Sequence, residues 1–451
     1  MKHSARRASR FSRKLATMAA VALVGLGLAS CQATAAPTAT GKVTLNWWGY
    51  GPDVSVVDQY LAAFNKQYPN IKVNFKLISQ ATYQAVLRPA LASNNGPDLF
   101  LESPGGLGFS QFSQYGLDLT GQFKKALGAN WKSKIAPGGV ANFIKNGKLL
   151  AAPVGQDVAG FLWINKDLFD KYKITPPTTF DQWSKACAEF TSNGVNCFVQ
   201  GAQMEPFNQD TYQSIANSIK PGLYYKAVQG KAKWTDPDLV KALTVWKSMF
   251  DDGIMQKGAL GLAQYPDADS AFMAGKYAMV QMGTWYMANT RADIAASSMK
   301  AAGYPGSTPF TILPIPFPTV SGGQAGELFG DSGGGLAVNA KSAKKDAAST
   351  FALWLATSPK GQQTIANLLT NTPSLGGTVP DFTAIKLVDE ADQEPALKTL
   401  LVKAEKVVEP RQLSNQDLAT ALGTELSTVA LGTSSPADAA ATMQKAAAGL
   451  G

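Results

Sequence analysis

The sequence predicts an α/β protein with two lobes, each a mainly parallel sheet flanked by helices. Stretches with apolar residues at every second position alternate with stretches of helical spacing, which is typical of parallel sheets covered by helices. Breaks rich in Gly, Pro and Asn separate these stretches. The chain of 451 residues is too long for one hydrophobic core, so a second lobe is expected.

The first lobe opens with alternating strands and helices. Val43, Leu45 and Trp47 alternate with polar residues and predict a strand, which the stretch Gly49–Pro52 ends. The elements expected next are a helix over 55–68, a strand over 72–78, a helix over 83–93 and a strand over 98–101.

Later helices carry start signals. Thr179-Phe180-Asp181-Gln182 fits a capping box, and Asp236-Pro237 fits an N-cap followed by proline in the first turn. The helix after the capping box is expected to bury one face, formed by Phe180, Trp183, Cys187 and Phe190. Residues 342–356 predict a further helix, and the chain after Asp381 is expected to be almost wholly helical.

The first thirty residues predict a bacterial lipoprotein signal peptide. Basic residues precede an uncharged apolar run over 15–28, which is too short to span a bilayer. The run ends at Leu28-Ala29-Ser30-Cys31, which resembles a lipobox. We therefore expect a signal peptide over 1–30, a lipid on Cys31 that holds the protein at the outer face of the cell membrane, and a flexible tether over 31–41. An ordinary secretory peptide, with Cys31 incidental, is the alternative.

The composition excludes several classes of function. The formal charge is +9, but six of the 41 basic residues precede Cys31, so the remaining chain carries only +3 and nucleic-acid binding is not implied. The single histidine, His3, lies in the predicted signal peptide, which argues against Ser-His-Asp catalysis and histidine metal sites. Paired-carboxylate catalysis is not excluded. We expect no metal and no cofactor.

Two cysteines follow the predicted tether, Cys187 and Cys197. Because the cell exterior is oxidising, a disulfide between them is expected, and a reactive thiol pair is the alternative.

A series of motifs connects the chain to a known family. In chain order they are Leu45-Asn46-Trp47-Trp48-Gly49, residues 63–73, 95–100, 116–120, 160–170, 272–285, 313–316 and 333–338. Together they resemble the family 1 extracellular solute-binding proteins of ABC importers, which include the maltose-binding proteins. The stretch 160–170 departs from the family pattern, since Ile164 stands where tyrosine is usual.

The resemblance implies the type II periplasmic-binding-protein fold, with a ligand cleft between the lobes. It places crossings between lobes near 151–157, near 310–317 and after Leu355. The expected N-lobe is then 42–152 plus 313–357, and the C-lobe is 153–312 plus 358–451. It also implies a monomer that carries a mono- or oligosaccharide to the transmembrane subunits of an ABC permease, and no enzymatic activity.

Candidate ligand-binding residues are aromatics, acids and amides just past strands. Ligands of open α/β sheets sit beyond the carboxyl ends of the strands. If the ligand is a sugar, aromatic rings suit its C–H faces, and acids or amides suit its hydroxyls. Strand alternation places Trp47 in the core and turns Trp48 to the other side. The candidates are Trp48, Gln80, Tyr83, Glu102, Gln156, Asp157, Glu205, Trp285, Tyr286, Asp331 and Arg411. For Glu205 and Trp285 the resemblance adds a cleft position, with Trp285 as the stacking ring.

Other ligands and activities remain open at this stage. Glu102, Asp157, Glu205 and Trp285 could serve a cationic solute such as a polyamine. A secreted glycosidase would need only two carboxyl groups flanking the scissile bond.

Overall fold

The computed structural model describes residues 41–448 except 94, 106–107, 137–139, 321–322, 324 and 408. The predicted signal peptide, Cys31 and almost all of the predicted tether lie outside these residues. From Gly41 onward the chain forms one unit.

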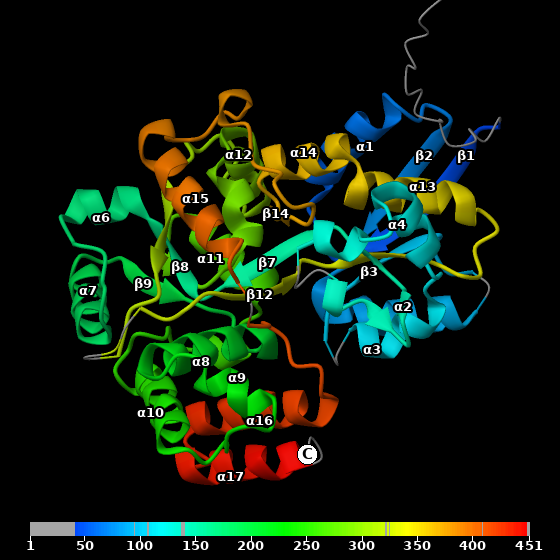
Figure 1. Cartoon of the computed structure of the whole chain (residues 1–451). Helices are drawn as coiled ribbons and strands as arrows, with labels where there is room; N and C mark the ends of the chain where they lie inside the picture. The colour runs from blue at the N-terminus through cyan, green and yellow to red at the C-terminus, as the bar shows by residue number, and fades with distance from the viewer. Residues whose placement is uncertain are drawn as a thin grey trace, which may run out of the picture. The chain divides into compact units, whose positions relative to one another are not determined.

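The first sheet has the strand order β2-β1-β3-β13-β6, of which β1, β2 and β3 are labelled in Figure 1. Its strands are β1 Val43–Gly49, β2 Ile71–Leu77, β3 Leu99–Glu102, β13 Gly335–Val338 and β6 Ala152–Pro153. β1 pairs in parallel with β2 and β3, whereas β13 is antiparallel to β3. The flanking helices are α1 Val54–Asn65, α2 Gln80–Ala92, α4 Thr120–Leu127, α13 Lys345–Thr357 and α14 Pro359–Leu368. Shorter pieces are α3 Phe109–Phe112, η1 Ser113–Tyr115, η2 Trp131–Lys134, β4 Ile144–Lys145 and β5 Lys148–Leu149.

The second sheet has the strand order β11-β8-β10-β9. Its strands are β8 Phe161–Asn165, β9 Asn196–Val199, β10 Tyr277–Val280 and β11 Ile312–Pro316. Its longer helices are α6 Lys166–Tyr172, α7 Phe180–Ser192, α8 Glu205–Ile219, α9 Leu223–Val228, α10 Pro237–Asp251, α12 Ala292–Ala301, α15 Glu390–Ala404, α16 Gln416–Leu431 and α17 Pro436–Ala447. Short helical turns are η3 Ala259–Gly261, η4 Gln264–Ala268, α11 Asp269–Met273, η5 Thr284–Thr290 and η6 Phe382–Ala384.

A small linking sheet, β12-β7-β14, joins these two parts of the chain. β7 Gly155–Ala159 lies between β6 of the first sheet and β8 of the second, and β12 Phe329–Ser332 leads back into β13. β14 Thr372–Pro373 pairs with β7 on the other side. The predicted first crossing, 151–157, overlaps β6 and β7.

The predicted lobe boundaries at 313 and 357 need correction. Residues 312–316 form β11, which pairs along its whole length with β8 of the second sheet, so the crossing back occurs at β12. Pro314 and Pro316 are tolerated there because β11 is an edge strand. At the other boundary, α14 packs on α1 and α13 and therefore belongs with the first sheet, and the crossing expected after Leu355 lies at β14.

The helix starts follow the local sequence signals. Thr179 Oγ1 accepts a hydrogen bond from the N–H of Gln182 at 3.3 Å, as the capping box predicts, although Gln182 in turn accepts from Thr178 rather than from Thr179. Asp236 caps α10 through the N–H of Asp238 at 3.0 Å.

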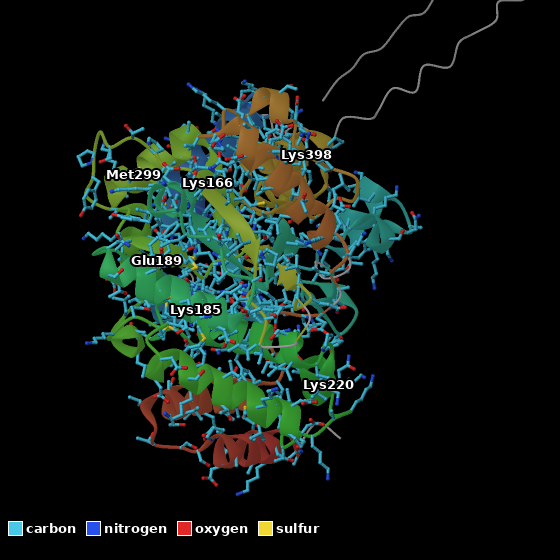
Figure 2. All side chains as sticks on the ribbon, turned by 90° about the vertical axis from the view of Figure 1, so that its left-hand side faces the viewer. Lys166, Lys185, Glu189, Lys220, Met299 and Lys398 are labelled. Carbon is cyan, nitrogen blue, oxygen red and sulfur yellow. A yellow bond between two sulfur atoms is a disulfide. The ribbon has the colours of Figure 1, made fainter. Side chains whose placement is uncertain are left out.

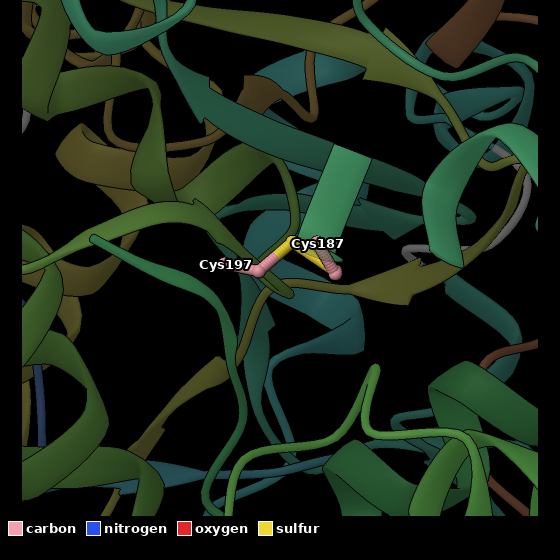
Figure 3. The surroundings of a disulfide bond; sticks show 2 residues. All are labelled: Cys187 and Cys197. Carbon is pink, nitrogen blue, oxygen red and sulfur yellow. A yellow bond between two sulfur atoms is a disulfide. The ribbon is translucent and has the colours of Figure 1, made fainter. Parts of the chain in front are cut away.

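Helix α7 shows how one face of such a helix is buried. The predicted inward residues Phe180, Trp183, Cys187 and Phe190 are all buried. Lys185 and Glu189, from the same helix, are exposed and are labelled in Figure 2. Cys187 is joined by a disulfide to Cys197 of β9, which ties this helix to the second sheet (Figure 3).

Candidate functional site

Two carboxylates face each other in the linking sheet. Asp157 of β7 and Asp331 of β12 are direct partners in the antiparallel register, so their side chains lie on the same face. Asp331, only 3% exposed, accepts hydrogen bonds from the Asn142 amide at 2.8 Å and from the backbone N–H of Gln412. Asp157 accepts from the side chain of Asn371, next to β14.

Gly333 explains part of this arrangement. A Cβ atom at Gly333 would lie 2.6 Å from Oδ1 of Asp157 and 2.4 Å from Nδ2 of Asn371. A side chain there would separate the two groups, so the glycine is required by their close approach.

Burial shifts the acidity of both carboxyl groups. Desolvation raises the pKa of Asp157 to about 6, and the Arg411 guanidinium and the Asn371 hydrogen bond oppose the shift. Desolvation likewise raises the pKa of Asp331 to about 6, against the hydrogen bonds from Asn142 and Gln412. Both groups are therefore mostly ionised at neutral pH, but close to the range in which they take up protons.

Arg411 is a buried cation beside this pair. Its Nε and Nη2 each donate to the Asp210 carboxylate of α8 at 2.8 Å, and the residue is 8% exposed. Its charge also acts on Asp157 and Asp331. Gln281 donates to the same Asp210 carboxylate at 3.4 Å, so the ion pair is supported from the strand side.

Trp285 supplies an aromatic surface next to Arg411. The guanidinium carbon lies 4.3 Å from the centre of the indole ring, within cation–π distance. The indole N–H donates to the hydroxyl of Tyr265 at 3.1 Å. The ring packs so closely over Gly283 that a Cβ at this position would lie 2.1 Å from it. Trp285 is partly exposed, so one portion of its surface stays accessible.

Glu102 brings a further carboxyl group from the end of β3. It is 2% exposed, and among the described residues its Oε1 has no hydrogen-bond partner. Burial raises its pKa well above the ordinary value. Burial raises the pKa of the Tyr50 hydroxyl, and the charges of Asp157 and Glu102 raise this pKa further.

The structure thus brings together several residues predicted from the sequence. The group comprises Asp157, Trp285, Asp331 and Arg411, and Glu102 lies opposite Gly335 in the neighbouring β3–β13 pair. Gln156 precedes Asp157 in β7, so its side chain points to the other face of the strand. Glu205 begins α8 and lines a small cavity with Gln412, the neighbour of Arg411. The cavity measures about 20 Å³.

Other predicted residues lie elsewhere. Tyr286 was expected to face a ligand, but it is a core residue: it is 2% exposed, packs near Trp163, and donates its hydroxyl to Asp269 at 2.9 Å. The reason is the turn of η5, which sends neighbouring side chains in different directions. Tyr83 is also buried, and its hydroxyl donates to the backbone carbonyls of Trp48 and Leu101, which ties the ends of β1 and β3 together.

Trp48 and Gln80 make other contacts. Lys76 of β2 covers the Trp48 ring, with Nζ 4.6 Å from the ring centre. Gln80 is the first residue of α2 and is partly exposed. Within the described part of the chain, no observed contact connects either side chain to Asp157 or Arg411.

Sequence reasoning missed several members of the site, namely Tyr50, Asn142, Asp210, Tyr265 and Asn371. One of them carried a signal. Asp210 sits in α8 at a position between buried neighbours, and an ionisable residue on the inner face of a helix implies a specific partner. The others lie in loops or turns, where local pattern does not reveal which residues meet.

No metal site accompanies these groups: the described residues contain no cluster of three or more His, Cys, Asp or Glu side chains that could hold an ion. In the same part of the chain, no helix has the length and apolar character needed to cross a membrane.

The fold and site define a two-sheet binding protein, and comparison with known proteins gives its family. The family model for bacterial extracellular solute-binding proteins matches residues 48–363, more than half of the chain. The protein therefore belongs to this family, and the resemblance inferred from the motifs is confirmed.

Curated relatives match over part of their length. An uncharacterised ABC transporter extracellular-binding protein of Pyrococcus horikoshii is 24% identical over 298 residues, which cover 63% of each chain. The multiple sugar-binding protein of Streptococcus mutans is 23% identical over 60% of this chain and 65% of its own. The melibiose/raffinose/stachyose-binding protein of Bacillus subtilis is 29% identical over 37% of each chain. The matches thus span less than two thirds of these relatives.

Solved structures confirm the predicted fold class. A structure from work on xylan utilization by Caldanaerobius polysaccharolyticus superposes with a TM-score of 0.72 at 25% identity, covering 89% of this chain and 99% of the other. A maltose-bound protein of T. maritima gives a TM-score of 0.69 at 20% identity, covering 89% and 98%. The chain has the α/β fold of periplasmic binding proteins.

Proposed function

We propose that this protein captures a mono- or oligosaccharide between its two main sheets and delivers it to the transmembrane subunits of an ABC permease, without chemical turnover. The observation that carries the proposal is the place of a partly exposed indole ring, Trp285, beside Arg411 and next to β7, to which the preceding Thr284 is hydrogen-bonded and in which Asp157 lies opposite Asp331. The ring suits the C–H face of a sugar, and the carboxylates accept hydrogen bonds from its hydroxyls. Relatives named as sugar-binding proteins support this ligand class.

The same arrangement gives a mechanism for capture. Glu102 and Tyr50 belong to the first sheet, and Trp285 and Asp210 belong to the part built on the second sheet. Asp157 and Asp331 lie in the linking sheet between them. A ligand that contacts both parts stabilises only the form in which they are close, so its binding shifts the population toward that closed form. The permease would bind this form.

The predicted N-terminus completes the proposal. A lipid on Cys31 would hold the monomeric protein at the outer face of the cell membrane, and the tether over 31–41 would leave the sheets free to move. Mass spectrometry of the membrane fraction tests this: a diacylglycerol mass on Cys31 is expected, and Cys31→Ser should release the protein into the medium.

A thermal-shift screen over mono- and oligosaccharides tests the ligand class. A sugar present at a hundred times its dissociation constant should stabilise the protein by about 2.7 kcal/mol. Trp285→Ala should abolish the shift, because the sugar loses its stacking surface. Tyr304→Ala is the matched control, since Tyr304 is an exposed aromatic residue at the end of α12, and it should leave the shift unchanged.

Two other outcomes would contradict the proposal. Stabilisation by a polyamine and by no carbohydrate would make the protein a carrier of cationic solutes, which the excess of carboxylates at the site could serve. Cleavage of an oligosaccharide during incubation, measured by chromatography of the products, would make it a glycosidase.

A further inference from the structure

The opposed carboxylates Asp157 and Asp331 are an unfavourable feature that the fold retains. Like charges directly opposite each other in an antiparallel pair destabilise the sheet. Burial makes the repulsion stronger, because little solvent separates the groups, and Asp331 is only 3% exposed. An arrangement that costs stability at a binding site points to a role in binding.

The hydrogen-bond donors around the pair do not supply the missing positive charge. Asn142, Asn371 and the backbone of Gln412 are neutral donors. Among the groups of the described chain that bear on Asp157, Arg411 is the cation, while Asp210 and Asp331 are anions. Three ionised carboxylates against one guanidinium leave two negative charges uncompensated.

Arg411 is also committed elsewhere. Its Nε and Nη2 both donate to Asp210, and its guanidinium carbon lies 4.3 Å from the centre of the Trp285 ring. A guanidinium held in a bidentate pair with one carboxylate cannot turn to neutralise two others without breaking that pair.

Glu102 is an independent indication of a ligand. It comes from the first sheet, it is 98% buried, and its Oε1 has no partner within the described residues. A buried acceptor left without a donor is costly unless something else binds it. Glu102 lies opposite Gly335 in the β3–β13 register, and Gly333, two residues before Gly335, lies against the Asp157 carboxylate, so Glu102 and the carboxylate pair come from adjoining strands.

We infer that the solute carries a protonated amine which Asp157 and Asp331 bind together, so that the ligand class is a basic saccharide such as an amino sugar. The inference rests on the proposed function. A sugar hydroxyl brings one hydrogen, whereas an ammonium group brings three donors and a positive charge. One ammonium can therefore bridge both carboxylates and remove half of the uncompensated charge, while the pyranose ring stacks on Trp285.

Matched pairs of sugars test the inference by calorimetry at pH 7.5. The pairs are glucosamine, galactosamine, mannosamine and the glucosamine oligomers, each against its neutral N-acetyl counterpart. Binding of at least one amine at least about tenfold tighter than its N-acetyl form is expected. Binding of N-acetyl or other neutral sugars with no preference for the amine overturns the inference but leaves the proposed function intact. Binding of no saccharide of either kind overturns both.

Two variants test which residues cause the preference for the amine over its N-acetyl form. Asp157→Asn keeps an oxygen for the Asn371 hydrogen bond but removes the charge, and Asp331→Asn is the second variant. Each should reduce the ratio of the affinity for the amine to that for its N-acetyl form to less than about threefold, whatever the change in the affinity for neutral sugars. Asp252→Asn, an exposed residue at the end of α10, is the matched control and should keep the full preference. An unchanged preference in both site variants would overturn the assignment.

The pH dependence gives an independent readout. Asp157 and Asp331 take up protons near pH 6, so the affinity for the amine should fall as the pH is lowered from 7.5 to 5.5. The affinity for an N-acetyl sugar should change less. Equal changes for the two ligands would contradict the role of the charges.

Discussion

Two buried regions of the molecule are built from opposite kinds of side chain. The helical layer of α10, α16 and α17 is apolar, with Leu243, Trp246 and Leu426 all fully buried and packed together (Figure 1). The linking sheet of β7, β12 and β14 buries polar groups, including Asp331 and Ser332. The contrast separates two kinds of burial: apolar packing stabilises the fold, whereas the charged groups buried in the linking sheet, where we propose that the ligand binds, reduce its stability.

The largest expected effect on stability lies in the helical layer. Trp246→Ala removes a fully buried ring and the hydrogen bond from its indole N–H to the Leu426 carbonyl at 2.8 Å. The free energy of unfolding should fall by about 3–5 kcal/mol, measured by urea denaturation. The affinity of the remaining folded protein for its ligand should not change. A loss of affinity at unchanged stability would break the distinction between the two regions.

Asp210→Asn tests a residue that belongs to both regions. Asp210 lies on α8, which packs against α10 and α16 of the helical layer, and its carboxylate holds Arg411 of the site. The variant leaves Arg411 buried with a neutral partner, so stability should fall by about 3 kcal/mol. Affinity should fall as well, since Arg411 is no longer held against Trp285. Calorimetry and urea denaturation of the same preparation measure both effects.

The control for this variant is Asp238→Asn. It removes the ion pair with Lys220 at 3.2 Å, in which the Lys220 side chain is 55% and the Asp238 side chain 40% exposed. Because exposed ion pairs contribute less than about 1 kcal/mol, stability and affinity should both stay close to the original values. Equal losses in the two variants would show that burial of the Asp210 pair has no special importance.

The smallest expected effect is the pH dependence of the ligand-free protein. The pKa of Asp157 and of Asp331 is about 6 in the folded chain, above the value of about 3.9 for an unfolded aspartate. The folded state therefore binds more protons between these values, and stability should rise as the pH falls from 7 through 6, by on the order of 1–2 kcal/mol.

Asp157→Asn isolates this contribution from the others. Asp269 also has a raised pKa, about 7, and acts in the same direction, so the difference between the two proteins matters rather than either curve alone. The variant should melt at a higher temperature than the original protein at pH 7.5, and the difference should shrink by pH 5.5. A difference in melting temperature that stays constant over this pH range would show that the repulsion does not come from the ionised Asp157 carboxylate.

The sequence predicted the elements well where the pattern is local. The strand expected over 72–78 is β2, Ile71–Leu77, and the alternation in β1 correctly placed Trp47 in the core at 2% exposed. The capping box at Thr179 marked the start of α7. These succeed because periodicity and capping depend on neighbours along the chain.

The site was only partly predictable. Glu102 was expected because it follows a strand, and Trp285 because the family resemblance gives it a stacking role; Trp285 lies against Arg411, and Glu102 lies opposite Gly335 of β13. Trp48 was predicted from its place at a strand end and Tyr286 as the neighbour of Trp285. Lys76 covers the Trp48 ring and Tyr286 is a core residue, since the direction of a side chain in a short turn depends on what packs around it. The start of the second crossing was placed too early, because strand pairing, which no local pattern reveals, assigns β11 to the second sheet.

The sequence by itself determined the class of fold and the family, since both follow from the order of local patterns and motifs along the chain. Only the tertiary structure decided that Asp157 lies opposite Asp331 and that Arg411 is held by Asp210. Asp157 and Asp331 are 174 positions apart in the sequence, and Asp210 and Arg411 are 201 positions apart. The register of a sheet and the docking of a late segment on α8 set them, and neither leaves a mark in the neighbouring sequence.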